Sequence, residues 1–309
     1  MRHRWQPREL EAYDEMKELR FAVIGTGFWA RYQLAAWREV PGARCVALCN
    51  RTRAKAEALA REFGVPAVYE DAEQLLQSEK PDFLDIITDV DTHSRFVHLA
   101  AAYQTPVICQ KPMAPSIAEA EKMIAACAAD HVPLSVHENW RWQTPIRELK
   151  KVLDSSVIGP VFRARIDYCN SFPVFDNQPF LKTLEEFILS DMGSHIFDVA
   201  RFLFGEAARL YCQMHQITPG IRGEDAASVM LRMQSGATVT VNLSYASRVE
   251  HDRFPETFVH VEEVAAHVRE DEFFQRLEER LVVEDGKTVA VINSRAEHRA
   301  DHAGVQNPF

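Results

Sequence analysis

Three polar side chains in this sequence could carry out acid–base chemistry on a hydroxyl group, and two of them are Asp191 and His195. They are four residues apart in the apolar run Glu185–Phe204, which predicts a helix with both side chains on one face. A carboxylate can orient an imidazole and raise its basicity, which suits general acid–base catalysis. A structural histidine–aspartate pair or a helix cap would have the same spacing, and Asp198 is a competing partner for His195.

Lys111 is the third of these side chains. The segment Gln110–Pro112 follows the apolar run Val107–Cys109, which predicts a buried strand that the proline ends. Ligands of open parallel sheets bind at the carboxyl ends of the strands. A lysine there can donate a hydrogen bond to a substrate hydroxyl. The alternative is a surface lysine at the start of a loop.

The pattern Gly25-x-Gly27-x-x-Ala30 indicates a dinucleotide site. An apolar run, Phe21–Ile24, precedes it and a helical pattern follows it, which is the context in which this motif binds a dinucleotide. Gly25 permits the tight turn, Gly27 lets a pyrophosphate approach the backbone, and Ala30 lets the helix pack close to the strand. The helix N-terminus offers free N–H groups and a partial positive charge. Glycine-rich turns also occur without a ligand.

The choice between NAD and NADP is predicted from Asn50, which lies twenty residues after Ala30. An acidic residue at this position would bind the adenosine ribose of NAD. This sequence instead has asparagine, followed by Arg51 and Arg53. The loss of a carboxylate and the gain of two guanidinium groups favour a 2′-phosphate, and therefore NADP. The alternative is a solvated, basic start of a helix.

Two further groups could contact ligands. The triplet Trp140-Arg141-Trp142 lies where the sequence pattern changes, and it could line a sugar pocket or form an interdomain hinge packed by aromatic burial. Thr88 and His93 follow a strand-like run, and they could reach the cofactor or cap the next helix.

The elements of the first half alternate between strand and helix, which implies a parallel sheet with helices on both faces. The strand-like runs are Arg20–Ile24, Arg44–Cys49, Phe83–Thr88, Pro106–Cys109 and Pro133–His137. The helical patterns are Arg31–Glu39, Arg53–Glu62, Ala72–Gln77, Ser94–Ala102 and Ile117–Ala129.

The second half has helices at Thr144–Leu153 and Glu185–Phe204 among longer strands, which predicts a mostly antiparallel sheet of the α+β class. These strands are Val161–Cys169, Arg209–Gln216, Ala226–Met233, Ala237–Tyr245 and Thr257–Val261. The segment Gln234–Gly236 reads as a hairpin turn. We therefore predict an α/β domain over residues 1–140, with an extension over 1–18, and a second domain over 141–309.

The tail after Glu262 has a different pattern. A charged helix is expected over Glu263–Glu279, and a hairpin is expected over Leu281–Ile292 around Asp285-Gly286. The last segment, Ser294–Phe309, has no periodicity. We expect residues 263–309 to be atypical or partly disordered.

Composition limits the class of protein. A length of 309 residues predicts two domains. A formal charge of −10 argues against nucleic acid or an anionic membrane as the main partner. Six cysteines without a CxxC pair argue against a zinc site or a disulfide framework, so no metal is predicted. No apolar run indicates a membrane span or a signal peptide, and the expected location is the cytoplasm.

Together these features resemble the GFO/IDH/MocA family of oxidoreductases, from about Leu19 to Glu262. The motifs that carry the resemblance are Gly25–Ala30, Asp91–His93, Val107–Pro112, Asn139–Arg141 and Ser190–Asp198. The family implies an N-terminal Rossmann domain and a C-terminal open-sheet domain that covers the nicotinamide and often mediates oligomerisation. It also implies NAD(P)-dependent oxidation or reduction of a sugar or polyol.

By resemblance, Lys111, Asp191 and His195 occupy the catalytic positions, and Arg141 and Trp142 join them in binding the substrate. The positions implied to contact the cofactor are Gly25, Thr26, Gly27, Phe28, Trp29, Asn50, Arg51, Arg53, Thr88, His93, Gln110, Lys111 and Asn139. In this hypothesis His195 takes the hydroxyl proton and Asp191 orients His195 or a neighbouring hydroxyl. Lys111 stabilises the developing alkoxide, and the cofactor carries the hydride.

Two departures from the family pattern leave other functions open. Gln110 replaces the glutamate of the usual Glu-Lys-Pro, and the sequence leaves the pattern after Glu262. One alternative is an NAD-dependent glycoside hydrolase of the same family, which has no net oxidation. The other is a non-catalytic sensor that binds the cofactor.

Overall fold

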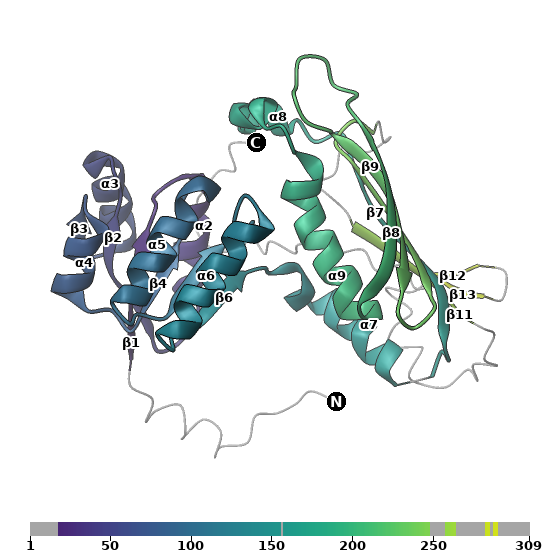
Figure 1. Cartoon of the computed structure of the whole chain (residues 1–309), viewed down its shortest axis with the longest axis horizontal. Helices are drawn as coiled ribbons and strands as arrows, with labels where there is room; N and C mark the ends of the chain where they lie inside the picture. The colour runs from purple at the N-terminus through teal and green to yellow at the C-terminus, as the bar shows by residue number, and fades with distance from the viewer. Residues whose placement is uncertain (1–17, 156, 248–256, 264–281, 285–286, 290–309) are drawn as a thin grey trace. The chain divides into compact units, whose positions relative to one another are not determined.

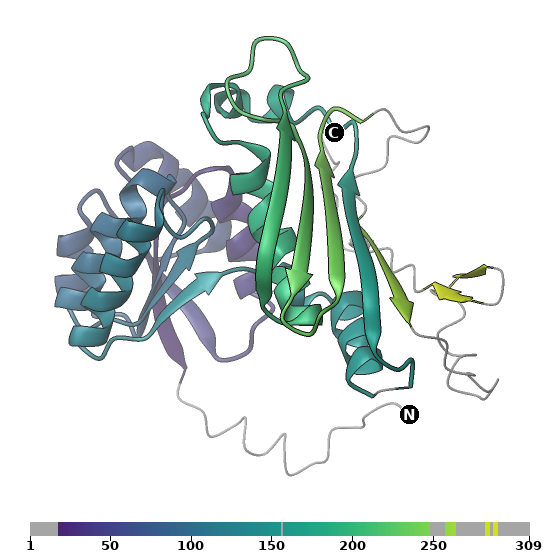
Figure 2. The same cartoon turned by 45° about the vertical axis from the view of Figure 1, so that its right-hand side comes forward.

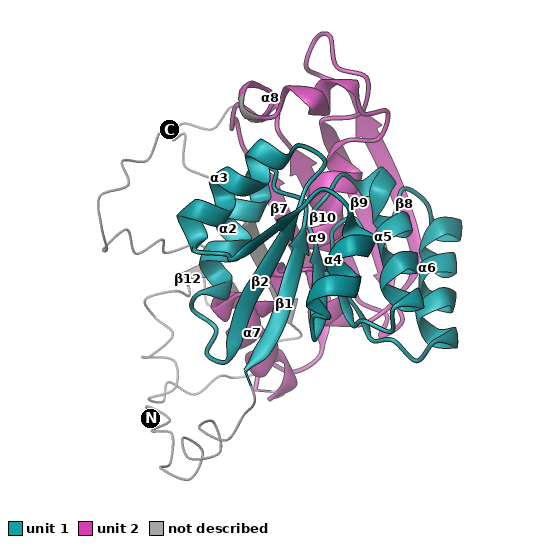
Figure 3. Cartoon of the chain, turned by 90° about the vertical axis from the view of Figure 1, so that its left-hand side faces the viewer, with its two compact units in different colours: residues 1–137 teal, residues 138–309 magenta. Residues whose placement is uncertain are grey.

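The computed structural model describes residues 18–155, 157–247, 257–263, 282–284 and 287–289 (Figure 1). The chain divides into two compact units, Met1–His137 and Glu138–Phe309 (Figure 3). The sequence pattern had placed the boundary after residue 140. None of the helices within the described ranges is both long and apolar enough to cross a lipid bilayer. The cytoplasmic location stays a prediction.

The described part of the first unit contains a six-stranded sheet in the order β3-β2-β1-β4-β5-β6, in which all neighbouring strands are parallel. The strands are β1 (Leu19–Ile24), β2 (Ala43–Cys49), β3 (Ala67–Tyr69), β4 (Phe83–Ile86), β5 (Val107–Gln110) and β6 (Leu134–His137). The predicted parallel sheet is therefore confirmed. The strand order reverses between β1 and β4, and dinucleotides bind at such a switch point.

Helices cover both faces of this sheet because alternate strand residues point to opposite sides. Along β1, Phe21 and Val23 pack into one core with Leu34 of the helix that follows. Ala22 and Ile24 pack into the other core. The helices are α2 (Phe28–Trp37), α3 (Arg53–Phe63), α4 (Ala72–Glu79), α5 (Val90–Ala102) and α6 (Ile117–Ala129).

The second unit is built on a five-stranded sheet in the order β11-β7-β10-β9-β8 (Figure 2). The strands are β7 (Val161–Cys169), β8 (Ala207–His215), β9 (Ala226–Met233), β10 (Thr238–Ser244) and β11 (Thr257–Glu263). Among these described strands, β7 and β10 are parallel and the other neighbours are antiparallel, so the sheet is mixed and mostly antiparallel, as predicted.

The helices α7 and α9 lie against one face of this sheet, as Figure 1 shows. Ile196, Val199 and Leu203 of α9 are buried in a core with Val229 and Val241 of the sheet. The helical segments of this unit are η1 (Trp140–Trp142), α7 (Thr144–Asp154), α8 (Val174–Asn177), η2 (Pro179–Thr183), η3 (Leu189–Gly193) and α9 (Ser194–Phe204).

One predicted helix needs correction. The sequence predicted a continuous α-helix over Glu185–Phe204, but its first part is the π-helical turn η3, and α9 starts only at Ser194. One tertiary contact and one local contact lie at this change of helix type. The backbone N–H of Ile188 donates to the carbonyl oxygen of Glu224, and a Cβ at Gly193 would lie 3.0 Å from the Phe197 ring. Asp191 lies in this π-helical turn and His195 lies in α9, so the two residues do not belong to one continuous α-helix.

The described part of the tail contains the short strands β12 (Val282–Glu284) and β13 (Lys287–Val289), which pair antiparallel. The predicted hairpin is thus confirmed in its two strands. The extension over residues 1–17, the helix over 264–279 and the segment Ser294–Phe309 lie outside the described residues.

Candidate active site

The turn after β1 is shaped by two glycines. Gly25 has φ of +103°, and a Cβ there would lie 2.2 Å from the carbonyl oxygen of Ile87. Only glycine therefore lets the end of β1 come this close to the segment after β4. A Cβ at Gly27 would have nothing within 4 Å, so the space in front of α2 is open.

The start of α2 has the properties of a phosphate site. Its N-cap, Gly27, makes no side-chain cap, and the first turn has no acidic residue. Thr26 Oγ1 is buried and has no hydrogen-bond partner, although buried hydroxyl groups are normally paired. The helix N-terminus, the open space and the unsatisfied hydroxyl together fit the pyrophosphate of a dinucleotide. Phe28 and Trp29, the first residues of α2, are exposed beside this turn.

The three residues predicted to select between NAD and NADP make different contacts. Asn50 Nδ2 donates to the carbonyl oxygen of Thr52 at 3.0 Å. The guanidinium of Arg53 forms an i,i+4 ion pair with Glu57, with Nε 2.8 Å from Oε1. Arg51 is exposed. The alternative of a basic helix start therefore describes Arg53 well, and the argument for a 2′-phosphate now depends mainly on Arg51.

His93 joins two loops at the carboxyl edge of the first sheet. It is buried, with Nε2 2.9 Å from the carbonyl oxygen of Thr88 and Nδ1 3.1 Å from that of Pro112. The N-cap of α5 is Asp89, so neither Thr88 nor His93 caps the helix. His93 therefore holds the loop that begins at Lys111 against the loop after β4. The contact of Thr88 and His93 with the cofactor stays a prediction.

Lys111 is positioned through its backbone. Its N–H donates to Oε1 of Gln110 at 2.8 Å. Gln110 Nε2 in turn donates to Gln33 Oε1 at 3.1 Å, so the residue before Lys111 is tied to helix α2. The sequence patterns did not point to Gln33.

In the second unit, Glu138 holds the imidazole of His195. Oε1 of Glu138 lies 2.7 Å from His195 Nδ1 and also accepts the backbone N–H of Trp140 at 2.9 Å. The indole of Trp140 stacks on the imidazole, with ring centroids 5.0 Å apart and an interplanar angle of 18°. His195 is 7% exposed. The ring is therefore fixed at one nitrogen and on one face.

Glu138 is the hydrogen-bond partner of His195 that sequence reasoning missed. The i,i+4 spacing pointed to Asp191, and Asp198 was the competing partner for His195. Asp198 instead forms a bidentate ion pair with Arg141, whose Nε lies 2.6 Å from Oδ2. The signal for Glu138 was its place directly before Asn139, at the start of a family motif.

Asp191 lies beside two tyrosines, of which Tyr168 is buried and Tyr245 is partly buried. The hydroxyl of Tyr168 donates to that of Tyr245 at 3.4 Å. Burial, and then the charges of Tyr168 and Asp191, raise the pKa of Tyr245 well above its usual range. Burial raises the pKa of Tyr168 to about 12. Both phenols therefore stay protonated at neutral pH and can act as hydrogen-bond donors.

The three residues Trp140–Trp142 near the start of the second unit make different contacts. Trp140 packs on His195, and Arg141 is held by Asp198. Trp142 is 62% exposed, with the guanidinium of Arg147 5.1 Å from its ring centroid. Asn139 is the N-cap of η1, and its carbonyl oxygen accepts the N–H of Trp142 at 3.1 Å. Substrate binding by Arg141 and Trp142, and cofactor binding by Asn139, stay predictions.

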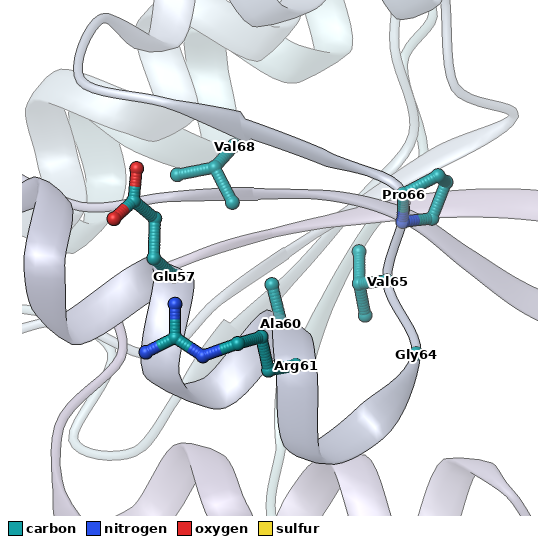
Figure 4. Close-up of a pocket in the computed structure, with 7 residues that line it drawn as sticks. All are labelled: Glu57, Ala60, Arg61, Gly64, Val65, Pro66 and Val68. Atoms are coloured by element: carbon teal, nitrogen blue, oxygen red, sulfur yellow. The ribbon is translucent and has the colours of Figure 1, made fainter.

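A surface hollow lies at the amino end of β3 in the first sheet, where α3 ends and β3 begins (Figure 4). Its lining is formed by Glu57, Ala60, Arg61, Gly64, Val65, Pro66 and Val68. Ligands of such sheets bind at the carboxyl edge, so this hollow is not the cofactor site. Among the described residues, no group of three or more histidines, cysteines or carboxylates is placed to hold a metal ion.

A doubly wound sheet with an open glycine turn at its switch point defines a dinucleotide-binding enzyme class, and comparison with known proteins specifies it further. Residues 19–138 match the oxidoreductase family with an NAD-binding Rossmann fold, and residues 146–266 match the GFO/IDH/MocA C-terminal domain. The chain belongs to the GFO/IDH/MocA family of NAD-binding oxidoreductases.

The relatives include two proteins named D-apiose dehydrogenase. The one from Rhizobium rhizogenes is 41% identical over 82% of this chain and 74% of its own length. The one from Paraburkholderia graminis is 42% identical over 80% of this chain and 66% of its own length, slightly less than two thirds. The sequences of Gln110–Pro115 and Glu138–Gln143 had already suggested a similarity to D-apiose dehydrogenases, and the similarity to these relatives extends over most of the chain.

A solved structure is similar in fold as well as in sequence. It is an oxidoreductase from Agrobacterium radiobacter in complex with NAD+, L-tartaric acid and magnesium. It is 42% identical to this chain, has a TM-score of 0.77, and is matched over 79% of this chain and 72% of its own length. None of these three relatives is named as a glycoside hydrolase or a sensor, so they give no support to those alternatives.

Proposed function

We propose that this chain transfers a hydride between NAD(P) and a hydroxyl-bearing carbon of a sugar or polyol. The observation that carries the proposal is the buried His195 with its Nδ1 held by the Glu138 carboxylate. An imidazole held in this way is a general base of fixed orientation. The names of the relatives make D-apiose the first substrate to test.

In the proposed reaction, His195 Nε2 takes the proton of the substrate hydroxyl while Glu138 stabilises the imidazolium that forms. The ammonium of Lys111 donates a hydrogen bond to the same oxygen and stabilises its developing negative charge. Asp191, with the hydroxyl of Tyr245, orients a neighbouring hydroxyl of the substrate. When bound, the nicotinamide supplies the hydride chemistry.

The cofactor is proposed to bind across the turn at Gly25–Gly27. The N–H groups at the start of α2 and the unsatisfied hydroxyl of Thr26 would hold its pyrophosphate. Asn50 and Arg51 would face the adenosine ribose, and Arg51 would favour the 2′-phosphate of NADP.

The experiment is a panel of pentoses, hexoses and polyols, with D-apiose first, assayed with NAD and with NADP. Net formation of reduced cofactor with a free sugar supports the proposal. Release of a glycoside leaving group without net reduction would favour the hydrolase, and cofactor binding with neither activity would favour the sensor. His195→Ala should lower the signal by about 10²-fold or more, whereas the exposed His98→Ala serves as the matched control.

We also propose that the second unit forms a homo-oligomer through the sheet face opposite to α9. Tyr211 and Met230 are register partners on this face and are 65% and 52% exposed. Lysine at either position should lower the molar mass measured by light scattering. Ile124→Lys, on α6 of the first unit, serves as the control. An unchanged mass in the sheet variants would rule out this interface.

A further inference from the structure

A line of hydrogen bonds leads from the buried middle of the first sheet to the partly buried backbone of Lys111. It begins at Asp85 on β4, which is fully buried and accepts bonds from Gln33 Nε2 at 2.7 and 2.8 Å and from Trp37 Nε1 at 2.8 Å. Gln33 Oε1 accepts from Gln110 Nε2 at 3.1 Å. Gln110 Oε1 accepts the N–H of Lys111 at 2.8 Å.

The hydrogen bonds of this line can donate in only one direction, because each amide has one orientation that pairs every donor with an acceptor. An ionised carboxylate only accepts hydrogen bonds, so Asp85 turns the NH₂ group of Gln33 toward itself. The carbonyl of Gln33 then points toward Gln110 and accepts from its NH₂ group, which also faces His137 Nδ1 at 3.3 Å. The carbonyl of Gln110 is left to accept from Lys111. Turning either amide over would bring two donors or two acceptors together in a buried or partly buried place, where unpaired polar groups are costly.

We propose that Asp85, Gln33 and Gln110 are positioning residues for Lys111, and that Asp85 and Gln33 require glutamine rather than glutamate at position 110. This inference rests on the proposed function, in which Lys111 contacts the substrate. It gives Gln110 a role in an active enzyme, whereas the sequence alone left the loss of the family glutamate as a sign of a sensor.

Position 110 requires glutamine because its side chain must both donate and accept a hydrogen bond. A glutamate at position 110 could accept the N–H of Lys111, but it has no hydrogen to give to Gln33 Oε1. It would also add a second negative charge close to the buried Asp85. In this protein the negative charge is on the carboxylate of Asp85. The neutral side-chain amides of Gln33 and Gln110 connect it to Lys111, and each amide fixes the orientation of the next group.

The same chemistry predicts that the hydrogen bonds of the line can be formed with donors and acceptors exchanged. In Asp85→Asn, the new amide donates to Gln33 Oε1, so Gln33 turns over and offers its NH₂ group to position 110. Glutamine there would meet donors at Gln33 and at the N–H of Lys111. Glutamate there accepts from both. The double variant Asp85→Asn with Gln110→Glu is therefore compatible where each single variant is not.

The experiment is this double-mutant cycle, with the melting temperature, kcat and KM measured for all four proteins. Each single variant should lower the melting temperature and lower kcat by about 10-fold, the size of one misplaced buried polar group. KM for the cofactor should change little. The double variant should recover most of both losses. Gln74→Glu, an exposed glutamine on α4, is the matched control.

Positioning through Lys111 is tested in a Lys111→Ala background. There, Gln110→Glu should cause no further loss of kcat, because the group that it misplaces is gone. A further 10-fold loss, or a double variant that is as impaired as the sum of the singles, would overturn the inference. Full turnover in Lys111→Ala alone would instead refute the proposed role of the lysine, and the melting temperatures would still decide whether the line exists.

A measurement on the unaltered protein covers the case in which the single variants do not fold. Amide hydrogen exchange of the whole chain should show the N–H of Lys111 protected to a degree similar to that of the strand amides of β5. Exchange as fast as that of an exposed loop would overturn the inference.

Discussion

His195 Nδ1 lies 2.7 Å from Oε1 of Glu138, a carboxylate that is 57 residues away in the sequence. This contact decides which acidic residue orients the proposed base. Trp140 stacks on the same imidazole and donates its backbone N–H to the same carboxylate, so each of the three residues contacts the other two. The contact leads directly to the first prediction.

Glu138→Gln should lower kcat by about 10²-fold, because the neutral amide no longer stabilises the imidazolium. In a His195→Ala background it should cost little more, since residues that act as a unit are not additive. The assay is steady-state turnover, with Glu148→Gln, whose carboxylate side chain is 47% exposed, as control. Unimpaired turnover in Glu138→Gln would refute the proposed pairing.

His195→Ala and Lys111→Ala should each reduce turnover by about 10²-fold or more, the usual range for a positioned proton-transfer group. Cofactor affinity should remain nearly intact in both. The combined loss should be smaller than the product of the two, because in the proposed mechanism both groups act on one substrate oxygen. Fluorescence titration with reduced cofactor separates binding from turnover. A multiplicative double variant would show that the two residues act independently.

Gly27→Glu should abolish dinucleotide binding while leaving the fold intact. The side chain has open space to enter, because a Cβ there meets nothing within 4 Å, and its carboxylate would repel the pyrophosphate. Gly25→Ala should behave differently and lower the melting temperature, since its Cβ would collide with Ile87. Normal cofactor affinity in a folded Gly27→Glu protein would exclude this turn as the phosphate site.

Asn50→Asp combined with Arg51→Leu should shift cofactor preference toward NAD, because the carboxylate repels a 2′-phosphate and the guanidinium is absent. Arg53→Leu alone should have a smaller effect, since Arg53 is paired with Glu57. The ratio of kcat/KM for the two cofactors measures the shift. If the unaltered protein already strongly prefers NAD, the charge argument is wrong.

Asp85 should make the first unit less stable at neutral pH than at mildly acidic pH. Burial raises the pKa of Asp85 from its usual 3.8 to about 6, although the hydrogen bonds from Trp37 and Gln33 oppose the rise. Between about pH 4 and 6 the folded chain therefore binds a proton that the unfolded chain does not. Stability is lost as the pH rises through 6, by about 3 kcal/mol in total.

Melting curves from pH 4 to pH 7 would test this sign, because Asp85→Asn removes the titrating group. The stability of the unaltered protein relative to Asp85→Asn should fall as the pH rises. Asp130→Asn, which removes an exposed carboxylate of the same unit, is the control. A relative stability that rises with pH would contradict the assignment.

Much of the fold follows from local sequence patterns. The helix α6 (Ile117–Ala129) and the strands β7 and β9 have the bounds that periodicity predicted. The glycine turn after β1 could also be predicted from the sequence, because the residues that shape it are neighbours in the chain. Elements of this kind are determined by hydrophobic periodicity and turn chemistry within a few residues.

The sequence by itself therefore determined the parallel sheet, the dinucleotide turn and the family, all of which depend on patterns between near neighbours. Only the tertiary structure decided that Glu138 rather than Asp198 holds Nδ1 of His195, and that Asp85 and Gln33 stand behind Gln110. It also decided the π-helical turn that contains Asp191, before which the N–H of Ile188 donates to the carbonyl oxygen of Glu224. Contacts between residues tens of positions apart leave no periodic signal, because they depend on where separate strands and helices meet in space.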